Sequence, residues 1–170
     1  MKFQTDTRKL PKSLRPEEFQ KLIKATPKKD KEARIAFLLA YASGMRLSEV
    51  KATTAAHFTQ NSIEIRGGKY GVDRIVPIPK GWRKWMEEAL PIKKSMRSLQ
   101  RNFKLAAKKA GLNPDYTFHS LRHGFGTRLI ESGVPSNQVQ LLMGHANLQT
   151  TSVYTKARPM DALKNYEELF

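Results

Sequence analysis

The chain has 170 residues, enough for one domain with its own hydrophobic core. Its 31 Lys and Arg residues against 15 Asp and Glu give a formal charge of +16, which indicates a polyanionic partner, usually nucleic acid. A charged membrane surface is the alternative, but no long apolar run or lipidation signal accompanies the charge. The chain has no cysteine, which excludes disulfides and Cys-based zinc sites.

Residues 1–14 are polar and basic without periodicity, and we expect them to form a linker or arm. The first residues lack the apolar core of a signal peptide, which predicts a cytoplasmic or nucleoid location. A helix is expected to open at Pro16, because proline suits the first helical turn and acidic residues suit the positive end of the helix dipole. Its apolar stripe consists of Phe19, Leu22 and Ile23.

Residues 31–43 are rich in Ala, Leu, Ile and Phe, and they predict a helix buried on both faces that stops at Gly44. A short helix follows from about Ser48. The alternating residues 62–66 and the segment 74–78 predict two strands. The glycine-rich stretch 67–71 between them predicts a β-hairpin with a loose tip, and Pro77 favours a strand end or sheet edge.

Helical patterns return in the second half of the chain. They cover about 81–90, 95–110, 121–132, a segment that Ser136 caps and Gly144 ends, 150–155 and 159–169. No internal repeat or low-complexity tract is found. The pattern predicts an α+β fold that is mainly helical, with one small antiparallel β-sheet.

Two isolated cations are candidates for chemistry. Arg46 follows the end of a very apolar helix, where a long cation is not needed for solubility. Lys69 lies at the hairpin tip, where flanking glycines allow a close approach to a ligand. Taken alone, each is better explained as a solvated surface cation.

Residues 119–123 (His-Ser-Leu-Arg-His) lie at an expected helix start. His119 and Arg122 are about one turn apart and can face one site, and a helix N-terminus favours phosphate. The alternatives are a capping histidine and a surface salt bridge, and His123 is interpreted as structural. Nearer the C-terminus, His145 follows a helix-ending glycine and Tyr154 lies nine residues further on. A lone tyrosine on a short helix is normally a core or boundary residue.

The four segments together resemble the tyrosine recombinase and integrase family, in the order and spacing of its Xer-like and phage-type members. They comprise an arginine box at 44–49, the hairpin Lys69, the box at 119–123, and the box from Leu142 to Tyr154. The resemblance runs from about Leu10 to the C-terminus. It implies that residues 15–170 form a catalytic domain with the DNA breaking-rejoining fold.

The resemblance also implies a mechanism of strand breaking and rejoining. Tyr154 would attack the scissile phosphate and form a 3′-phosphotyrosine. His119 would accept the proton of Tyr154 or support a neighbouring catalytic group. Lys69 would protonate the departing 5′-oxygen.

The remaining residues implied by the resemblance bind the phosphate. Arg46 and Arg122 would hold its two non-bridging oxygens, because a planar guanidinium donates paired hydrogen bonds to phosphate. His145 would add a third donor, and Glu49 orients Arg46 rather than reacting. No carboxylate cluster suited to a metal is found in the sequence, so neither a metal nor a cofactor is expected.

The implied partner is double-stranded DNA, with no membrane. Residues 159–170 carry a helical apolar stripe and either pack on a neighbouring protomer, supporting a tetramer, or on their own domain. Family members usually carry an N-terminal core-binding domain, and its absence here predicts a fragment or a naturally short version.

Two other functions remain alternatives. A catalytically silent DNA-binding regulator would lack some expected active residues, and a type IB topoisomerase-like enzyme would work as a monomer. A rolling-circle relaxase would need a metal-binding His-x-His arrangement, which the sequence lacks.

Overall fold

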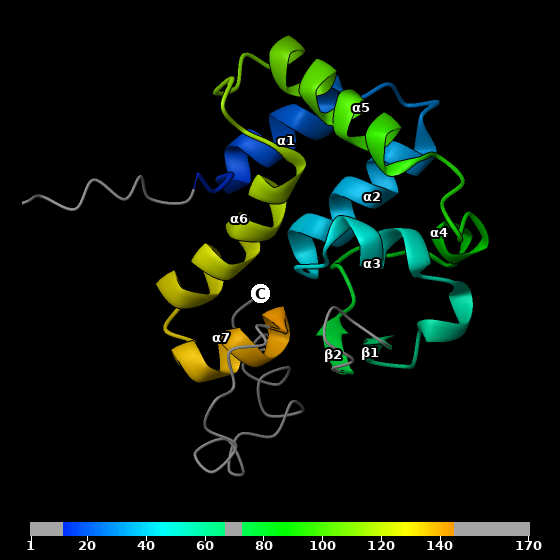
Figure 1. Cartoon of the computed structure of the whole chain (residues 1–170), viewed down its shortest axis with the longest axis vertical. Helices are drawn as coiled ribbons and strands as arrows, with labels where there is room; N and C mark the ends of the chain where they lie inside the picture. Colours follow the sequence, from blue (N-terminus) through cyan, green and yellow to red (C-terminus); the bar gives the residue numbers. More distant parts are fainter. Residues whose placement is uncertain (1–11, 67–72, 145–170) are drawn as a thin grey trace, which may run out of the picture.

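The computed structural model describes residues 12–66 and 73–144 (Figure 1). The helices of these residues are α1 (Pro16–Ala25), α2 (Lys31–Ala42), α3 (Leu47–Ala52), α4 (Lys84–Glu88), α5 (Met96–Lys109), α6 (Phe118–Glu131) and α7 (Ser136–Met143). A 3-10 turn, η1 (Ala55–His57), precedes the strands β1 (Ser62–Ile65) and β2 (Arg74–Pro77). The predicted mainly helical α+β fold with one small antiparallel sheet is confirmed.

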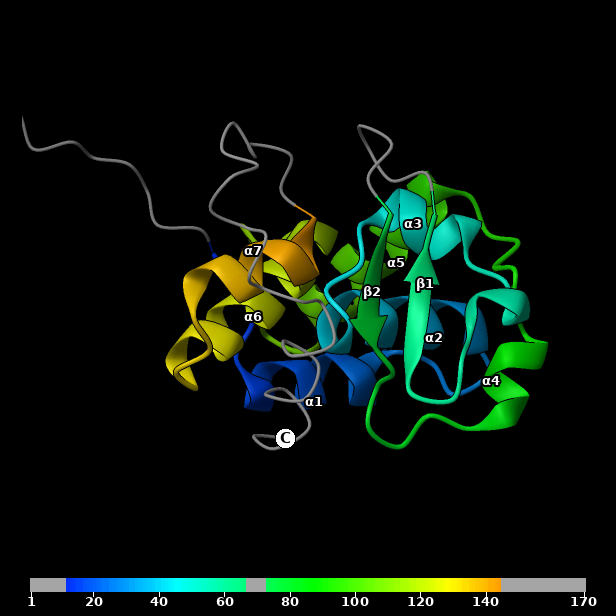
Figure 2. The same cartoon turned by 90° about the horizontal axis from the view of Figure 1, so that it is seen from below.

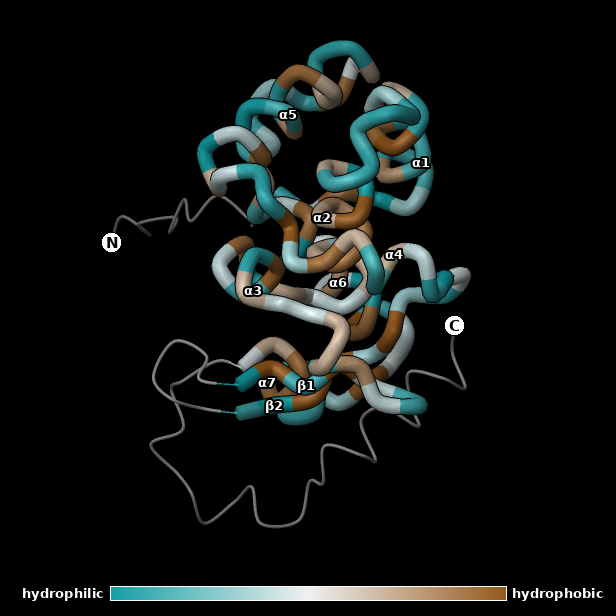
Figure 3. Tube along the Cα trace, turned by 90° about the vertical axis from the view of Figure 1, so that its right-hand side faces the viewer, coloured by the Kyte–Doolittle hydropathy of each residue, from teal (hydrophilic) through white to brown (hydrophobic). Residues whose placement is uncertain are grey.

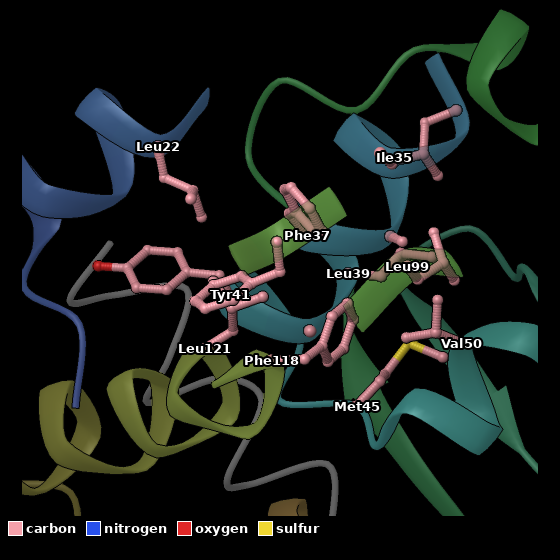
Figure 4. Close-up of a cluster of buried hydrophobic side chains, with 14 of the residues drawn as sticks. Leu22, Ile35, Phe37, Leu39, Tyr41, Met45, Val50, Leu99, Phe118 and Leu121 are labelled. Atoms are coloured by element: carbon pink, nitrogen blue, oxygen red, sulfur yellow. The ribbon is translucent and has the colours of Figure 1, made fainter. Parts of the chain in front are cut away.

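Helix α2 is the centre of the domain, as its apolar sequence predicts. Asp30 caps its N-terminus by accepting a hydrogen bond from the backbone N–H of Ala33 at 3.2 Å. Phe37 and Leu39, which lie on different faces of the helix, are both fully buried. Figure 4 shows side chains of α2 reaching toward α1 and α6, and Figure 3 shows hydrophobic residues along α2.

The apolar core is closed by helices packed around α2. Its most extensive helix contact is with α6, and α1 and α5 also pack on it. The ring of Phe37 contacts those of Phe103 from α5 and Phe118 from α6 edge-on, at centroid distances of 5.7 and 5.9 Å. This packing holds the start of α6, which carries the candidate residues His119 and Arg122, against the middle of α2.

The hairpin has the predicted antiparallel pairing. Its register joins Ser62 to Pro77 and Ile65 to Arg74, so Pro77 closes the strand end as expected. Figure 2 shows α7 on the β2 side of this sheet, and α7 and β2 are in contact. The glycine-rich tip lies outside the described residues.

The predicted limits of three helices are wrong. Helix α4 spans five residues instead of 81–90, because Gly81 turns the chain at a φ of 78° and Pro91 prevents helical continuation. Trp82 therefore lies before the helix and stacks on Phe58 at 5.1 Å, while Trp85 is 46% exposed.

The other two corrections concern helix starts. Helix α6 begins at Phe118 rather than 121, because the Ser120 hydroxyl accepts a hydrogen bond from the backbone N–H of Thr117 at 3.0 Å. Ser136 is the first residue of α7 and not its cap, since Pro135 occupies that position. The predicted helix ends at Gly44, Gly111, Gly133 and Gly144 agree with the positive φ of each of these glycines.

The segment just before α1 packs on the domain. Leu14 is 1% exposed, and its N–H donates to the carbonyl of Ser120 at 3.4 Å. Lys12 forms an ion pair with Asp115. The segment expected to be a linker therefore contributes a core side chain at its end. The helices expected at 150–155 and 159–169 lie outside the described residues. Within 12–66 and 73–144, no helix is long and apolar enough to cross a membrane.

Candidate active site at the end of helix α7

Arg46 lies at the N-terminus of α3, where its own turn fixes its side chain. Its backbone N–H donates to Glu49 Oε2 at 2.6 Å, and its Nη1 donates to Glu49 Oε1 at 3.0 Å. Its Nη2 reaches across to the carbonyl of Gly144 at 2.8 Å. The expectation that Glu49 orients Arg46 agrees with this geometry.

Arg122 comes to the same place from α6. Its residue is only 2% exposed, and its Nη1 donates to the carbonyl of Gly44 at 2.6 Å. Its Nη2 donates to the carbonyl of Met143. The same Nη1 lies 3.9 Å from Glu49 Oε2. The two arginines predicted to hold one phosphate are therefore brought together around Glu49.

A third arginine, Arg74, completes this cluster, and sequence reasoning missed it. It opens β2 and is 8% exposed. Its Nη1 and Nη2 donate to the two carboxylate oxygens of Glu49 at 2.7 Å each, and its Nε donates to the carbonyl of Leu142 at 2.8 Å. One signal was available: Arg74 is two residues before the buried Val76 and so shares its face of the strand.

We call Arg46, Arg74, Arg122 and the central Glu49 the arginine cage. Its three cations bind three successive carbonyls, those of Leu142 and Met143 at the end of α7 and that of Gly144, which caps the helix. The C-terminal carbonyls of a helix have no partner within the helix and carry its negative dipole end, so cations suit them. With one carboxylate among three guanidinium groups, the cage has two positive charges in excess.

The cage changes the acidity of its members. Burial alone would raise the pKa of Glu49, but the hydrogen bonds and charge of Arg74, together with hydrogen bonds from Arg46, lower it to about 2. Burial, followed by the nearby charges of Arg46 and Arg74, lowers the pKa of Arg122 to about 9. Both groups remain charged at neutral pH, so the excess charge persists and favours an anion.

Two histidines lie on α6, the helix that also carries Arg122. His119 is exposed, and its ring meets the ring of His123 edge-on at a centroid distance of 4.5 Å. Burial and then the charge of Arg122 lower the pKa of His123, which favours its neutral form. Arg122 was expected to face a phosphate site at the N-terminus of α6 together with His119. Its guanidinium instead binds the carbonyls of Gly44, after α2, and Met143, at the end of α7.

The other predicted site residues, Lys69, His145 and Tyr154, lie outside the described residues, as does the tail 159–170. In the sequence, His145 directly follows Gly144, whose carbonyl Arg46 holds. Among the described residues, no group of three or more His, Asp or Glu side chains could hold a metal ion.

A family model described as the phage integrase family matches residues 12–160. The chain therefore belongs to the phage integrase family, and the resemblance inferred from the four segments is confirmed.

The relatives of the chain are tyrosine recombinases. Tyrosine recombinase XerA of Thermococcus onnurineus is 36% identical over 167 residues, which cover 86% of this chain and 58% of that protein. The chain thus spans less than two thirds of the length of this relative.

Two solved relatives have the same fold. The XerH site-specific recombinase, in a post-cleavage complex with its palindromic difH substrate, matches with a TM-score of 0.67 and 25% identity, covering 96% of this chain and 56% of that one. A lambda integrase tetramer bound to a Holliday junction matches with a TM-score of 0.65 and 22% identity, covering 83% of this chain and 49% of that one.

Proposed function

We propose that residues 15–170 form the catalytic domain of a site-specific DNA recombinase or integrase, which cleaves and rejoins DNA through a 3′-phosphotyrosine at Tyr154. The observation that carries the proposal is the meeting of Arg46 and Arg122 in a buried cage with two excess positive charges. A phosphodiester is an anion whose charge grows in the transition state, and fixed guanidinium groups stabilise that charge without reorganising.

The two arginines have donors left for a phosphate. Arg122 uses one N–H of each Nη for the carbonyls of Gly44 and Met143, and a guanidinium has five N–H donors. Arg46 is 20% exposed at its side chain, so a ligand can reach it from solvent. In this proposal both bind the non-bridging oxygens of the scissile phosphate, and His145 adds a donor to the same oxygens.

The proton transfers belong to other residues of the same proposal. His119 accepts the proton of Tyr154 or assists a neighbouring group, and its exposed position on α6 leaves it open to DNA. Lys69 protonates the 5′-oxygen that leaves. These cations and donors act by position and charge, and neither a metal nor a cofactor is part of the proposed step.

The proposed partner is double-stranded DNA, at which the protein acts in the cytoplasm or nucleoid. The charge of +16 supports this partner, as do the DNA in the XerH complex and the Holliday junction in the lambda integrase complex. We further propose that copies of the chain assemble as tetramers on DNA through residues 159–170.

The deciding experiment incubates the full chain with a nicked suicide DNA substrate and detects a covalent adduct by denaturing gel. Tyr154→Phe removes only the hydroxyl, so it should abolish the adduct and leave DNA binding nearly intact. Tyr116→Phe is the control, because this hydroxyl bonds to Glu18 of α1 at 3.0 Å and not to the arginine cage. A normal adduct yield from Tyr154→Phe would rule out the proposed nucleophile.

A second substrate tests the acid. A 5′-bridging sulfur is a better leaving group than oxygen and needs no proton, so it should largely rescue Lys69→Ala. Equal defects on both substrates would instead mean that Lys69 only binds phosphate.

A further inference from the structure

Arg74 is the most enclosed arginine of the cage after Arg122, and the proposed mechanism gives it no part. We propose that Arg74 is a positioning residue for DNA cleavage: it holds the Glu49 carboxylate to itself and so leaves Arg46 and Arg122 available for the scissile phosphate. This inference rests on the proposed function.

The three arginines of the cage bind the Glu49 carboxylate unequally. Arg74 donates to both of its oxygens at 2.7 Å in a forked pair. Arg46 donates from its side chain to one oxygen only, at 3.0 Å, and Arg122 lies 3.9 Å away, too far for a hydrogen bond. Arg74 therefore makes the strongest interaction with the Glu49 carboxylate, although it has no proposed contact with DNA.

The second observation is that Arg74 is fixed from the opposite side. Its Nε donates to the Leu142 carbonyl, and its side chain is 5% exposed. Gly144 leaves room for it, since a Cβ at Gly144 would lie 2.9 Å from Arg74 Cδ and 3.0 Å from its Nη1. A planar guanidinium can make the fork and the Nε contact together, whereas a lysine ammonium cannot.

Removing Arg74 should redirect Glu49. A buried carboxylate needs a cation, and the nearest that remain are Arg46 and Arg122. Glu49 would then pair with the groups proposed to bind phosphate, and the excess charge of the cage would fall from two to one. The rate of DNA cleavage would fall, because the scissile phosphate carries more negative charge in the transition state than in the bound DNA.

The test is a double-mutant cycle on the single-turnover rate of adduct formation with the suicide substrate. Arg74→Met should slow adduct formation by roughly 10–100-fold, by analogy with the loss of residues that orient metal ligands. Adding Glu49→Gln removes the competing charge, so the double variant should regain about tenfold or more. Arg15→Met is the matched control, since Arg15 also pairs with a carboxylate, that of Glu131, but at the surface. It removes one positive charge and should leave the rate unchanged.

The outcomes separate the explanations. If Arg74 only joins β2 to α7, the double variant will be as slow as Arg74→Met or slower, which overturns the proposal. An unchanged rate for Arg74→Met also overturns it. If circular dichroism shows that Arg74→Met is unfolded, Arg74→Lys replaces it in the cycle, because it keeps the charge but loses the fork. It too should be slow and should be rescued by Glu49→Gln. If the wild-type chain forms no covalent adduct with the suicide substrate, the proposed function itself is wrong.

Discussion

Two buried regions of this domain are built on opposite principles. In the core around α2, side chains such as Phe37 and Leu99 are fully buried and share many apolar neighbours. In the arginine cage, each hydrogen bond joins a particular donor and acceptor, such as Arg74 Nε and the Leu142 carbonyl. Dispersion and hydrophobic contacts are individually weak and non-directional, whereas a buried charge depends on particular partners. The core should therefore respond to volume and the cage to geometry and charge.

The largest expected effect is on the core side. Phe37→Ala should lower the free energy of unfolding by about 3–5 kcal/mol, because it empties a fully enclosed site between α5 and α6. Urea denaturation at neutral pH measures the change. Leu105→Ala is the matched control, since Leu105 is 62% exposed and should cost less than about 0.5 kcal/mol. Equal losses from the two variants would mean that Phe37 does not close the core.

The second prediction concerns the arginine cage and the pH dependence of the stability that Glu49 contributes. The folded pKa of Glu49 is about 2, below its ordinary value of 4.5, so the native state binds fewer protons than the unfolded chain. The stabilisation is therefore complete above about pH 4.5 and is lost as the pH falls from 4.5 toward 2. It amounts to something on the order of 3 kcal/mol. Urea denaturation between pH 2 and 7 should show a flatter profile for Glu49→Gln. Identical acid profiles for the wild-type chain and Glu49→Gln would contradict the lowered pKa of Glu49.

A third, smaller effect compares two glycines that end helices with positive φ. Gly133 has φ 83° and open space at its Cβ position, whereas Gly144 has φ 57° and faces Arg74. Alanine at either position incurs about 1 kcal/mol of left-handed backbone strain. Gly144→Ala should cost roughly 1 kcal/mol more from overpacking, and of the two variants only it should slow adduct formation. The idea fails if Gly133→Ala is as harmful as Gly144→Ala in both measurements.

The smallest effect is expected at a salt bridge on the surface. Arg66 pairs with Glu64 at 2.7 Å, but its side chain is 68% exposed, so water screens the pair. Arg66→Met should leave the thermal unfolding midpoint unchanged, while Arg74→Met should lower it clearly. A comparable loss from Arg66→Met would show that burial does not explain the difference between the two pairs.

Most of the fold could be predicted because its signals are local. The unbroken apolar run of α2, the alternation in β1 and the glycines at 111 and 133 each fix an element within a few residues. The limits of α4 and α6 could not, since they depend on a turn at Gly81 and on a bond between Thr117 and Ser120. Such competing local contacts leave little trace in hydrophobic periodicity.

The site was only partly predictable for a different reason. Arg46, Arg122 and the orienting role of Glu49 followed from their segments and their resemblance to a family. Arg74 did not, because its burial arises from α3 and α7, which are distant from it in sequence. In a chain with 31 Lys and Arg residues, one more arginine on a strand carries little information. The roles of all the predicted site residues remain predictions, those of Arg46, Lys69, His119, Arg122, His145 and Tyr154 alike.

The succession of carbonyls at the end of α7 has a consequence for how the chain tolerates changes in length. Arg74, Arg122 and Arg46 bind three carbonyls from adjacent residues, from Leu142 to Gly144. One residue inserted within α7 would rotate those carbonyls by about 100° and advance them by about 1.5 Å, so all three arginines would lose their acceptors at once. An insertion beside the exposed Gly133, in the turn that precedes the helix, can be absorbed at the surface. The length of α7 is therefore set by arginines on three other elements.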